Sequence, residues 1–177
     1  MRHSILAMLP KNAIVAEIGV LGGDWSDKII KNTTPEKLVL IDTFCSNDYP
    51  HLKRFTKNSH FDFINSKFST PSIDIRKGLS WECLSEFEEN TFDWIYVDAA
   101  HDYKSVKKDL VEVHRVLKPN GYIIMNDYIM HDHIMKEDYG VVQATNEFML
   151  DNNFEMLCFA LHPDMFCDVL IKEIPTQ

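Results

Sequence analysis

The stretch that decides the fold is Phe92–Tyr103, which reads FDWIYVDAAHDY. Its first half, Phe92–Val97, is apolar enough for a buried strand, and Asp98 follows where that strand would end. A carboxylate at the carboxyl end of a parallel strand lies at the edge where open α/β sheets bind ligands. His101, three residues later, carries the side chain best suited to proton transfer near neutral pH. The stretch therefore predicts a parallel α/β sheet with a functional site at its carboxyl edge.

Strands and helices alternate on both sides of this stretch, which predicts one domain over residues 1–177. The predicted strands are Ala13–Ile18, Leu38–Ile41, Ser72–Arg76, Phe92–Val97, Tyr122–Met125, Phe154–Leu161 and Met165–Ile171. The predicted helices are Asp24–Lys31, His51–Asn65, Trp81–Phe87 with Ser80 as its cap, Tyr103–Leu117 and Val141–Leu150, with an irregular loop over Tyr128–Tyr139. The last two strands are joined so closely that they must be antiparallel.

The composition excludes several classes of protein. A net charge of −9 over 177 residues argues against a nucleic-acid binder that uses a broad basic face. No stretch approaches the roughly 18 apolar residues of a membrane span, and the first ten residues are too short an apolar run for a signal peptide. We therefore expect a cytoplasmic protein that binds no membrane. The four cysteines form no C-x-x-C pair, so they are expected to be buried free thiols.

The ends of the first three predicted strands carry residues suited to a nucleotide. Glu17, Gly19 and Gly23 surround the turn after the first strand, where glycine lets the backbone approach a ligand closely. Asp42 ends the second strand, where an acid can accept both hydroxyls of a ribose. Gly78–Ser80 follows the third strand. Each feature alone fits an ordinary turn, but together they predict a nucleotide site on one edge of the sheet.

Three stretches resemble the class I S-adenosylmethionine-dependent methyltransferases: Ala16–Ser26, Val97–Tyr103 and Lys118–Tyr128. The last two are similar to one branch, which includes macrocin-type sugar O-methyltransferases and cephalosporin-hydroxylase-like proteins and is related to the catechol-type O-methyltransferases. The resemblance spans Ala13–Phe148. It implies a Rossmann-like, mostly parallel sheet of seven strands, in the order 3-2-1-4-5-7-6, with helices on both faces and an antiparallel last strand.

The resemblance also implies S-adenosylmethionine as the cofactor. Its contacts would come from Glu17, Gly19, Gly23, Ser26, Asp42, Gly78, Ser80 and Asp98. The two glycines and Glu17 would border the methionine part, Asp42 the ribose and Ser80 the adenine. Two positions depart from the pattern: relatives often carry a basic residue at Gly22 and a histidine at Asn126.

Asp98 and Asp127 end adjacent predicted strands, so their carboxylates can share one hard cation. In the metal-dependent relatives, the acids at these strand ends bind Mg²⁺, and a third ligand lies beside the second acid. The resemblance therefore implies Mg²⁺ on Asp98, Asn126 and Asp127. The alternative is that the two acids only hydrogen-bond the cofactor and loop amides.

His101 is the candidate catalytic base, since the catechol-type relatives place a lysine base at the same spacing after the acid. It can instead cap the following helix or contact the cofactor. His131 and His133 lie in the loop after Asp127, where they can replace it as base or ligate the metal.

Together these features predict S-adenosylmethionine-dependent methylation of a small-molecule hydroxyl, in a sugar or another natural product, assisted by a divalent metal. A non-catalytic or hydroxylase-like protein that keeps the nucleotide-binding fold is the alternative. Only residues 1–12 precede the first predicted strand, where larger relatives carry a helical lid. The pocket is therefore expected to be open or completed by a second subunit in a homodimer.

Overall fold

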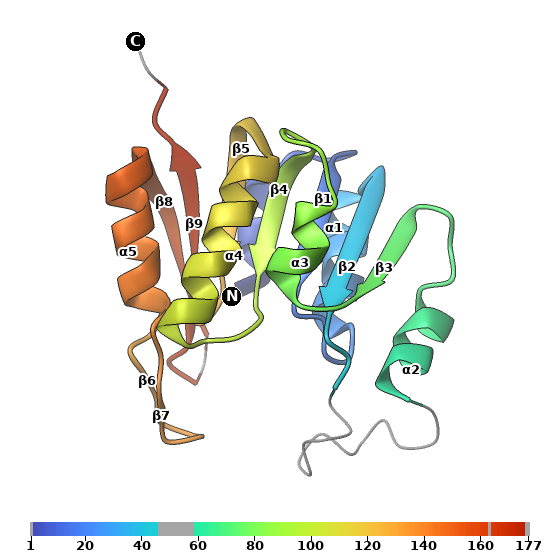
Figure 1. Cartoon of the computed structure of the whole chain (residues 1–177), viewed down its shortest axis with the longest axis horizontal. Helices are drawn as coiled ribbons and strands as arrows, with labels where there is room; N and C mark the ends of the chain where they lie inside the picture. The colour runs from blue at the N-terminus through green and yellow to red at the C-terminus, as the bar shows by residue number, and fades with distance from the viewer. Residues whose placement is uncertain (1, 46–58, 163, 176–177) are drawn as a thin grey trace.

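The computed structural model describes residues 2–45, 59–162 and 164–175. These residues form a seven-stranded sheet in the order β3-β2-β1-β4-β5-β9-β8 (Figure 1). The strands are β1 Ile14–Ile18, β2 Lys37–Asp42, β3 Ile73–Lys77, β4 Phe92–Val97, β5 Leu117–Met125, β8 Phe154–Leu161 and β9 Cys167–Glu173. In this sheet β9 alone runs in the opposite direction to the other six strands. The predicted strand order and the antiparallel last strand are therefore confirmed.

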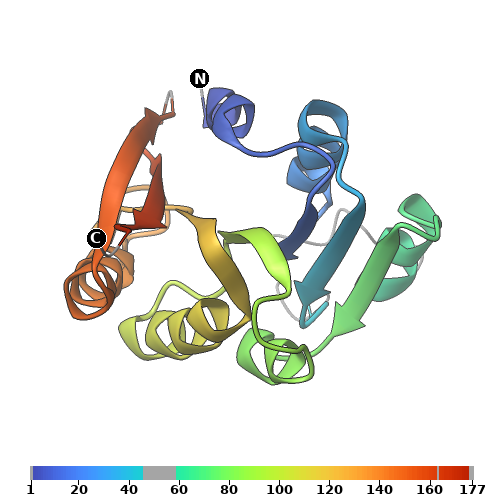
Figure 2. The same cartoon turned by 90° about the horizontal axis from the view of Figure 1, so that it is seen from above.

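Helices cover both faces of the sheet (Figure 2). They are η1 Arg2–Met8, α1 Asp24–Thr33, α2 His60–Lys67, α3 Ser80–Ser85, α4 Tyr103–Val116 and α5 Val141–Asn152. One core lies under α3, α4 and α5, and a second lies under η1, α1 and α2. None of the helices within the described residues is long and apolar enough to span a membrane.

The central strand β4 shows why the sheet is buried on both faces. Its side chains alternate between the two cores: Trp94 and Tyr96 pack into one, Ile95 and Val97 into the other. All four are at most 4% exposed. The strand is pinned between β1 and β5, so Asp98 must emerge at the carboxyl edge of the sheet.

Strand β5 begins earlier than the sequence predicts. Leu117, expected to be the last helical residue, is buried and pairs with Phe92 directly after α4 ends. The register then shifts, and regular pairing resumes at Tyr122 and Trp94. The breaker Lys118–Gly121 therefore forms an irregularity within the strand rather than a separate turn.

The connection after β5, expected to be irregular, contains a small hairpin of β6 His131–Asp132 and β7 Glu137–Asp138. The Asp132 carboxylate accepts hydrogen bonds from the backbone N–H groups of Ile134 and Met135, at 2.7 and 2.9 Å. This side-chain turn closes the hairpin. Because two-residue strands have no detectable apolar alternation, the pattern did not predict them.

The helix predicted over His51–Asn65 is only partly observed. Residues 51–58 lie outside the described residues, and α2 begins at His60 with Ser59 as its cap. The Ser59 hydroxyl accepts a hydrogen bond from the Asp62 N–H at 3.2 Å. All four cysteines lie in the described residues and are free thiols, but only Cys83 and Cys167 are buried.

Candidate active site

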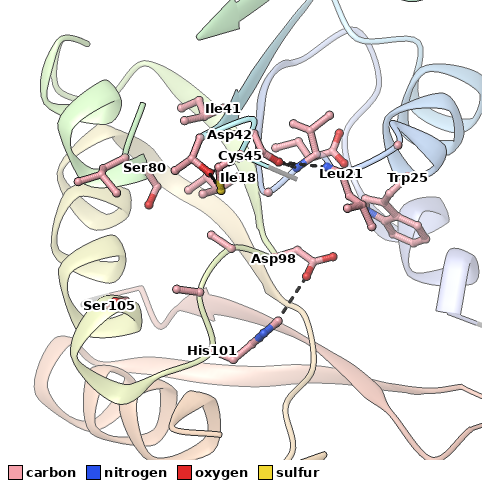
Figure 3. Close-up of a pocket in the computed structure, with 18 of the residues that line it drawn as sticks. Ile18, Leu21, Trp25, Ile41, Asp42, Cys45, Ser80, Asp98, His101 and Ser105 are labelled. Carbon is pink, nitrogen blue, oxygen red and sulfur yellow. Dashed lines mark hydrogen bonds and ion pairs between the residues drawn. The ribbon is translucent and has the colours of Figure 1, made fainter. Parts of the chain in front are cut away.

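A cavity of about 910 Å³ opens at the carboxyl ends of β1 to β4 (Figure 3). Its lining includes six of the residues predicted to hold the cofactor, namely Glu17, Gly19, Asp42, Gly78, Ser80 and Asp98. The other two, Gly23 and Ser26, are not among the described lining residues; Ser26 is fully buried in the first turn of α1. The cavity therefore brings together residues from four separate strand ends.

The turn after β1 requires glycine at position 19. Its φ is +84°, and a Cβ atom there would overlap the backbone carbonyl oxygen of Asp98. The Gly19 N–H donates to the Ile41 carbonyl at 2.8 Å. The loop thus passes directly over the end of β4, in a conformation that favours glycine.

The Asp42 carboxylate shapes the same loop. One oxygen accepts from the backbone N–H groups of Val20 and Leu21, at 2.8 and 3.1 Å. The other accepts from the Phe44 N–H at 2.7 Å. Figure 3 shows Asp42 reaching Leu21 across the cavity wall. Asp42 therefore holds the glycine-containing loop in place, a role that the sequence did not predict.

Two side chains of helix α2 hold the same loop from the other side, by contacting the backbone carbonyl oxygens of the loop. His60 Nε2 lies 2.5 Å from the Leu21 carbonyl oxygen, and Lys67 Nζ donates to the carbonyls of Gly22 and Gly23 at 3.1 Å each. Sequence reasoning missed both donors. Their spacing of seven residues places them on one helical face, but the sequence does not reveal what that face contacts.

Ser80 has a protein partner that the sequence did not predict. It is the first residue of α3 rather than its cap, which is Leu79. The Ser80 hydroxyl donates to the carboxylate of Asp109, which lies fully buried on α4. Burial raises the pKa of Asp109 to about 6, although the hydrogen bond from Ser80 acts to lower it. An acid between Val106 and Val113 on the apolar face of α4 was the signal that sequence reasoning missed.

Replacing Asp109 by asparagine is expected to stabilise the protein increasingly as the pH rises. The folded-state pKa of about 6 lies above the ordinary 3.8, so this carboxyl contributes stability below pH 3.8 that is lost as the pH rises through 6. Asparagine keeps an oxygen for Ser80 and cannot ionise. The gain in unfolding free energy should grow by about 2 kcal/mol between about pH 4.5 and pH 8, measured by urea unfolding.

The control for this experiment is Asp151→Asn, which changes an exposed acid on α5. A gain at Asp109 that is the same at both pH values, or that Asp151→Asn reproduces, would contradict the buried charge at position 109.

Three side chains meet where β4 and β5 end. His101 Nε2 lies 3.6 Å from an oxygen of Asp98 and 3.6 Å from an oxygen of Asp127. Nitrogen and oxygen atoms of the three side chains lie within 4.8 Å of one another, a group that can hold a metal ion. Asp127 adopts a left-handed φ of 48° as the chain leaves β5. The predicted pair of strand-end acids is thus brought together, with His101 between them.

His101 is held from two sides. Asp102, not His101, caps α4 by accepting from the N–H groups of Lys104 and Ser105 at 3.1 Å each, so the capping alternative for His101 is wrong. The Tyr139 ring, which sequence reasoning missed, stacks on the imidazole with centroids 4.4 Å apart and planes 3° apart. Burial lowers the pKa of His101, but the nearby carboxylates outweigh it and leave the pKa raised.

The remaining candidates lie outside this group of three. The Asn126 side-chain amide donates to Asp168 at 2.9 Å. His131 pairs with Asp138 at 2.7 Å on the hairpin, and the His133 ring packs against Phe166 with centroids 5.4 Å apart. Among the three histidines considered as bases, the structure therefore places His101 beside the two acids.

Comparisons with known proteins match the family and the fold of this chain. A family model described as a methyltransferase domain matches residues 16–128. A SAM-dependent methyltransferase from Aquifex aeolicus has a TM-score of 0.67 at 15% identity, covering 98% of this chain and 89% of that chain. An O-methyltransferase from Bacillus cereus in complex with SAH has a TM-score of 0.68 at 14% identity, covering 97% and 78%. A tRNA methyltransferase from B. subtilis has a TM-score of 0.66 at 15% identity, covering 98% and 65%. No curated protein matches the sequence significantly.

Proposed function

Because the chain belongs to the family of methyltransferase domains, we propose that it transfers a methyl group from S-adenosylmethionine to a hydroxyl oxygen of a small molecule. One observation carries the proposal: the cavity of about 910 Å³ joins the glycine loop and Asp42 to Asp98 and His101, and Asp127 lies beside these two residues. A bound nucleotide cofactor would therefore lie directly beside groups able to move a proton or hold a cation.

The donor set of the cavity fits S-adenosylmethionine. Gly19 lines the cavity, and its backbone allows a close approach because it carries no side chain. Asp42 lies where a carboxylate can accept from ribose hydroxyls, and Ser80 lies where a hydroxyl can meet an adenine edge. Glu17 lines the cavity and keeps its predicted place beside the methionine part, whereas Gly23 lies outside the described lining.

His101 is proposed as the base that takes the proton from the acceptor hydroxyl. The sulfonium of the donor is already a good leaving group, so the chain mainly aligns the reactants and activates the nucleophile. Without a bound cation, the neutral imidazole accepts a proton readily, since the carboxylates of Asp98 and Asp127 stabilise its charged form. The stacked Tyr139 ring holds the imidazole plane while it does so.

Asp98 and Asp127 are proposed to hold a divalent cation, which would lower the pKa of a bound hydroxyl. Two carboxylates fit Mg²⁺. The amide oxygen of Asn126 stays the predicted third ligand, and His101 is the alternative. If His101 is a ligand, the mixed nitrogen and oxygen set also suits Mn²⁺.

The acceptor class and the assembly are further proposals. The motifs favour a sugar or another natural product, as in the macrocin-type branch. With a net charge of −9, we expect no nucleic-acid partner. We also propose a cytoplasmic location and a homodimer that completes the acceptor side of the cavity.

Calorimetric titration with S-adenosylmethionine and its demethylated product tests the cofactor proposal. We expect binding in the range of about 1 µM to 1 mM, typical of enzyme substrates. Asp42→Ala should weaken it at least about tenfold, because it removes a ribose acceptor and loosens the loop held at Val20 and Leu21. Asp74→Ala, an acid on the neighbouring strand β3 outside the described cavity lining, is the control. Absence of binding to the unaltered protein would refute the proposed function.

A further inference from the structure

Two successive residues at the start of β9 hold the residues on either side of Asp127. The Asn126 side-chain amide donates to the Asp168 carboxylate at 2.9 Å, and the Tyr128 N–H donates to the Cys167 carbonyl at 2.8 Å. The Cys167 thiol donates back to the Tyr128 carbonyl at 2.9 Å. Both flanks of Asp127 are therefore fastened to one strand, which lies beside β5 in the sheet (Figure 1).

The backbone of Asp127 needs such support. Its φ of 48° is a left-handed conformation, which is uncommon for residues other than glycine, although aspartate adopts it more readily than most. Such residues persist where the surroundings hold them in place. The Asn126 N–H still donates to the Val97 carbonyl at 2.9 Å, so the chain leaves the sheet at Asp127 itself. The direction of the Asp127 carboxylate therefore depends on how firmly its two neighbours are held.

Asp168 is a rigid acceptor for this purpose. Its side chain is fully buried, and a buried carboxylate is tolerated only when donors surround it. Asn126 and His162 reach one oxygen at 2.9 and 3.3 Å, and the Tyr96 hydroxyl reaches the other at 3.3 Å. With donors on both oxygens, the carboxylate has one preferred orientation, and the orientation of Asn126 follows from it.

We propose that Asp168 is a positioning residue for the cation site. Through Asn126 it holds the Asp127 carboxylate opposite Asp98 and His101, although it is not itself a member of that group. The part of this inference that concerns the cation rests on the proposed function. The part that concerns the backbone at Asp127 does not need a cation.

The test uses Mn²⁺ as the probe, because its bound and free forms are distinguished by electron paramagnetic resonance. Asp168→Ala should weaken Mn²⁺ binding about 10- to 100-fold, as is usual when a group supporting a ligand is removed. Asp168→Asn should bind within about threefold of the unaltered protein, because its amide oxygen can still accept from Asn126. Asp168→Val, which fills the volume without an acceptor, replaces the alanine variant if that variant does not fold.

Tyr96→Phe is the matched control, since it removes the donor on the other oxygen of Asp168 and leaves the bond to Asn126. It should bind Mn²⁺ like the unaltered protein even if it unfolds at a lower temperature. Unchanged Mn²⁺ affinity in the alanine and valine variants overturns the proposal. Equal weakening in Tyr96→Phe also overturns it, because the effect would then follow general loosening of the core.

Amide hydrogen exchange over residues 124–130, measured without metal, separates this inference from the proposed function. We expect faster exchange in the alanine or valine variant at Asp168 than in Tyr96→Phe. If the unaltered protein binds no Mn²⁺, the proposed cation fails, and exchange alone decides the role of Asp168. Equal exchange in these variants would then overturn it.

Discussion

Replacement of Asp127 by alanine is expected to weaken divalent-cation binding at least about 100-fold and to lower methyl transfer by about 10³-fold or more. Asp127 is one of the two carboxylates at the adjacent ends of β4 and β5, and its oxygen lies 3.6 Å from His101 Nε2. Without it, one carboxylate remains to hold the cation, and His101 loses one of the charges that raise its pKa. The measurements are Mn²⁺ titration and formation of the demethylated cofactor with a panel of sugars and phenols.

Asp138→Ala is the control for this prediction, since Asp138 is an exposed hairpin acid outside the group of three. His101→Gln in the same assays separates a base from a ligand. Loss of a base should lower the rate about 10²- to 10⁴-fold at nearly unchanged Mn²⁺ affinity, whereas loss of a ligand should lower the affinity as well. Activity that survives both exhaustive EDTA treatment and Asp127→Ala would rule out the proposed cation.

Replacement of Gly19 by alanine is expected to abolish cofactor binding and to lower the unfolding free energy by about 3 kcal/mol. The new methyl group would overlap the carbonyl oxygen of Asp98, and this backbone atom cannot move away by a side-chain rotation. The Asp98 N–H donates to the Ile18 carbonyl at 2.7 Å, so relief requires separating β1 from β4. Thermal unfolding should show a decrease of about 10 °C, with calorimetry showing no binding of the demethylated cofactor.

Gly22→Ala is the matched control in the same loop. Among the described residues, the glycines with positive φ are Gly19 and Gly23, so an alanine at position 22 meets no left-handed strain. It should retain cofactor binding and unfold close to the unaltered protein. If Gly19→Ala behaved in the same way as this control, the close packing of the loop on β4 would be disproved.

The strands and helices of the parallel part were predictable because each βαβ unit is local, whereas the strand order was implied by the resemblance to class I methyltransferases. Apolar runs of five or six residues alternate with amphipathic helices, and a parallel crossover has one preferred hand. The hairpin β6–β7 and the early start of β5 were not predictable in this way. They depend on a side-chain turn at Asp132 and on the burial of Leu117, neither of which has a periodic signature.

The meeting of Asp98 and Asp127 was also predictable, since two adjacent parallel strands end at the same edge. The partners of the other site residues were not. Ser80 on α3 is hydrogen-bonded to Asp109 on α4. Asn126 is hydrogen-bonded to Asp168 on β9, which lies 42 residues later in the chain. Sequence spacing carries no information about hydrogen bonds between segments so far apart.

By itself, the sequence determined the strands of the sheet and the edge at which Glu17, Asp42 and Asp98 emerge, because hydrophobic alternation and strand ends are properties of neighbouring residues. Only the tertiary structure decided that His101 lies between the two acids and that β9 bonds to the residues on either side of Asp127. The reason is physical: a buried polar group must find a partner wherever packing places one, and packing joins residues that are distant in the chain.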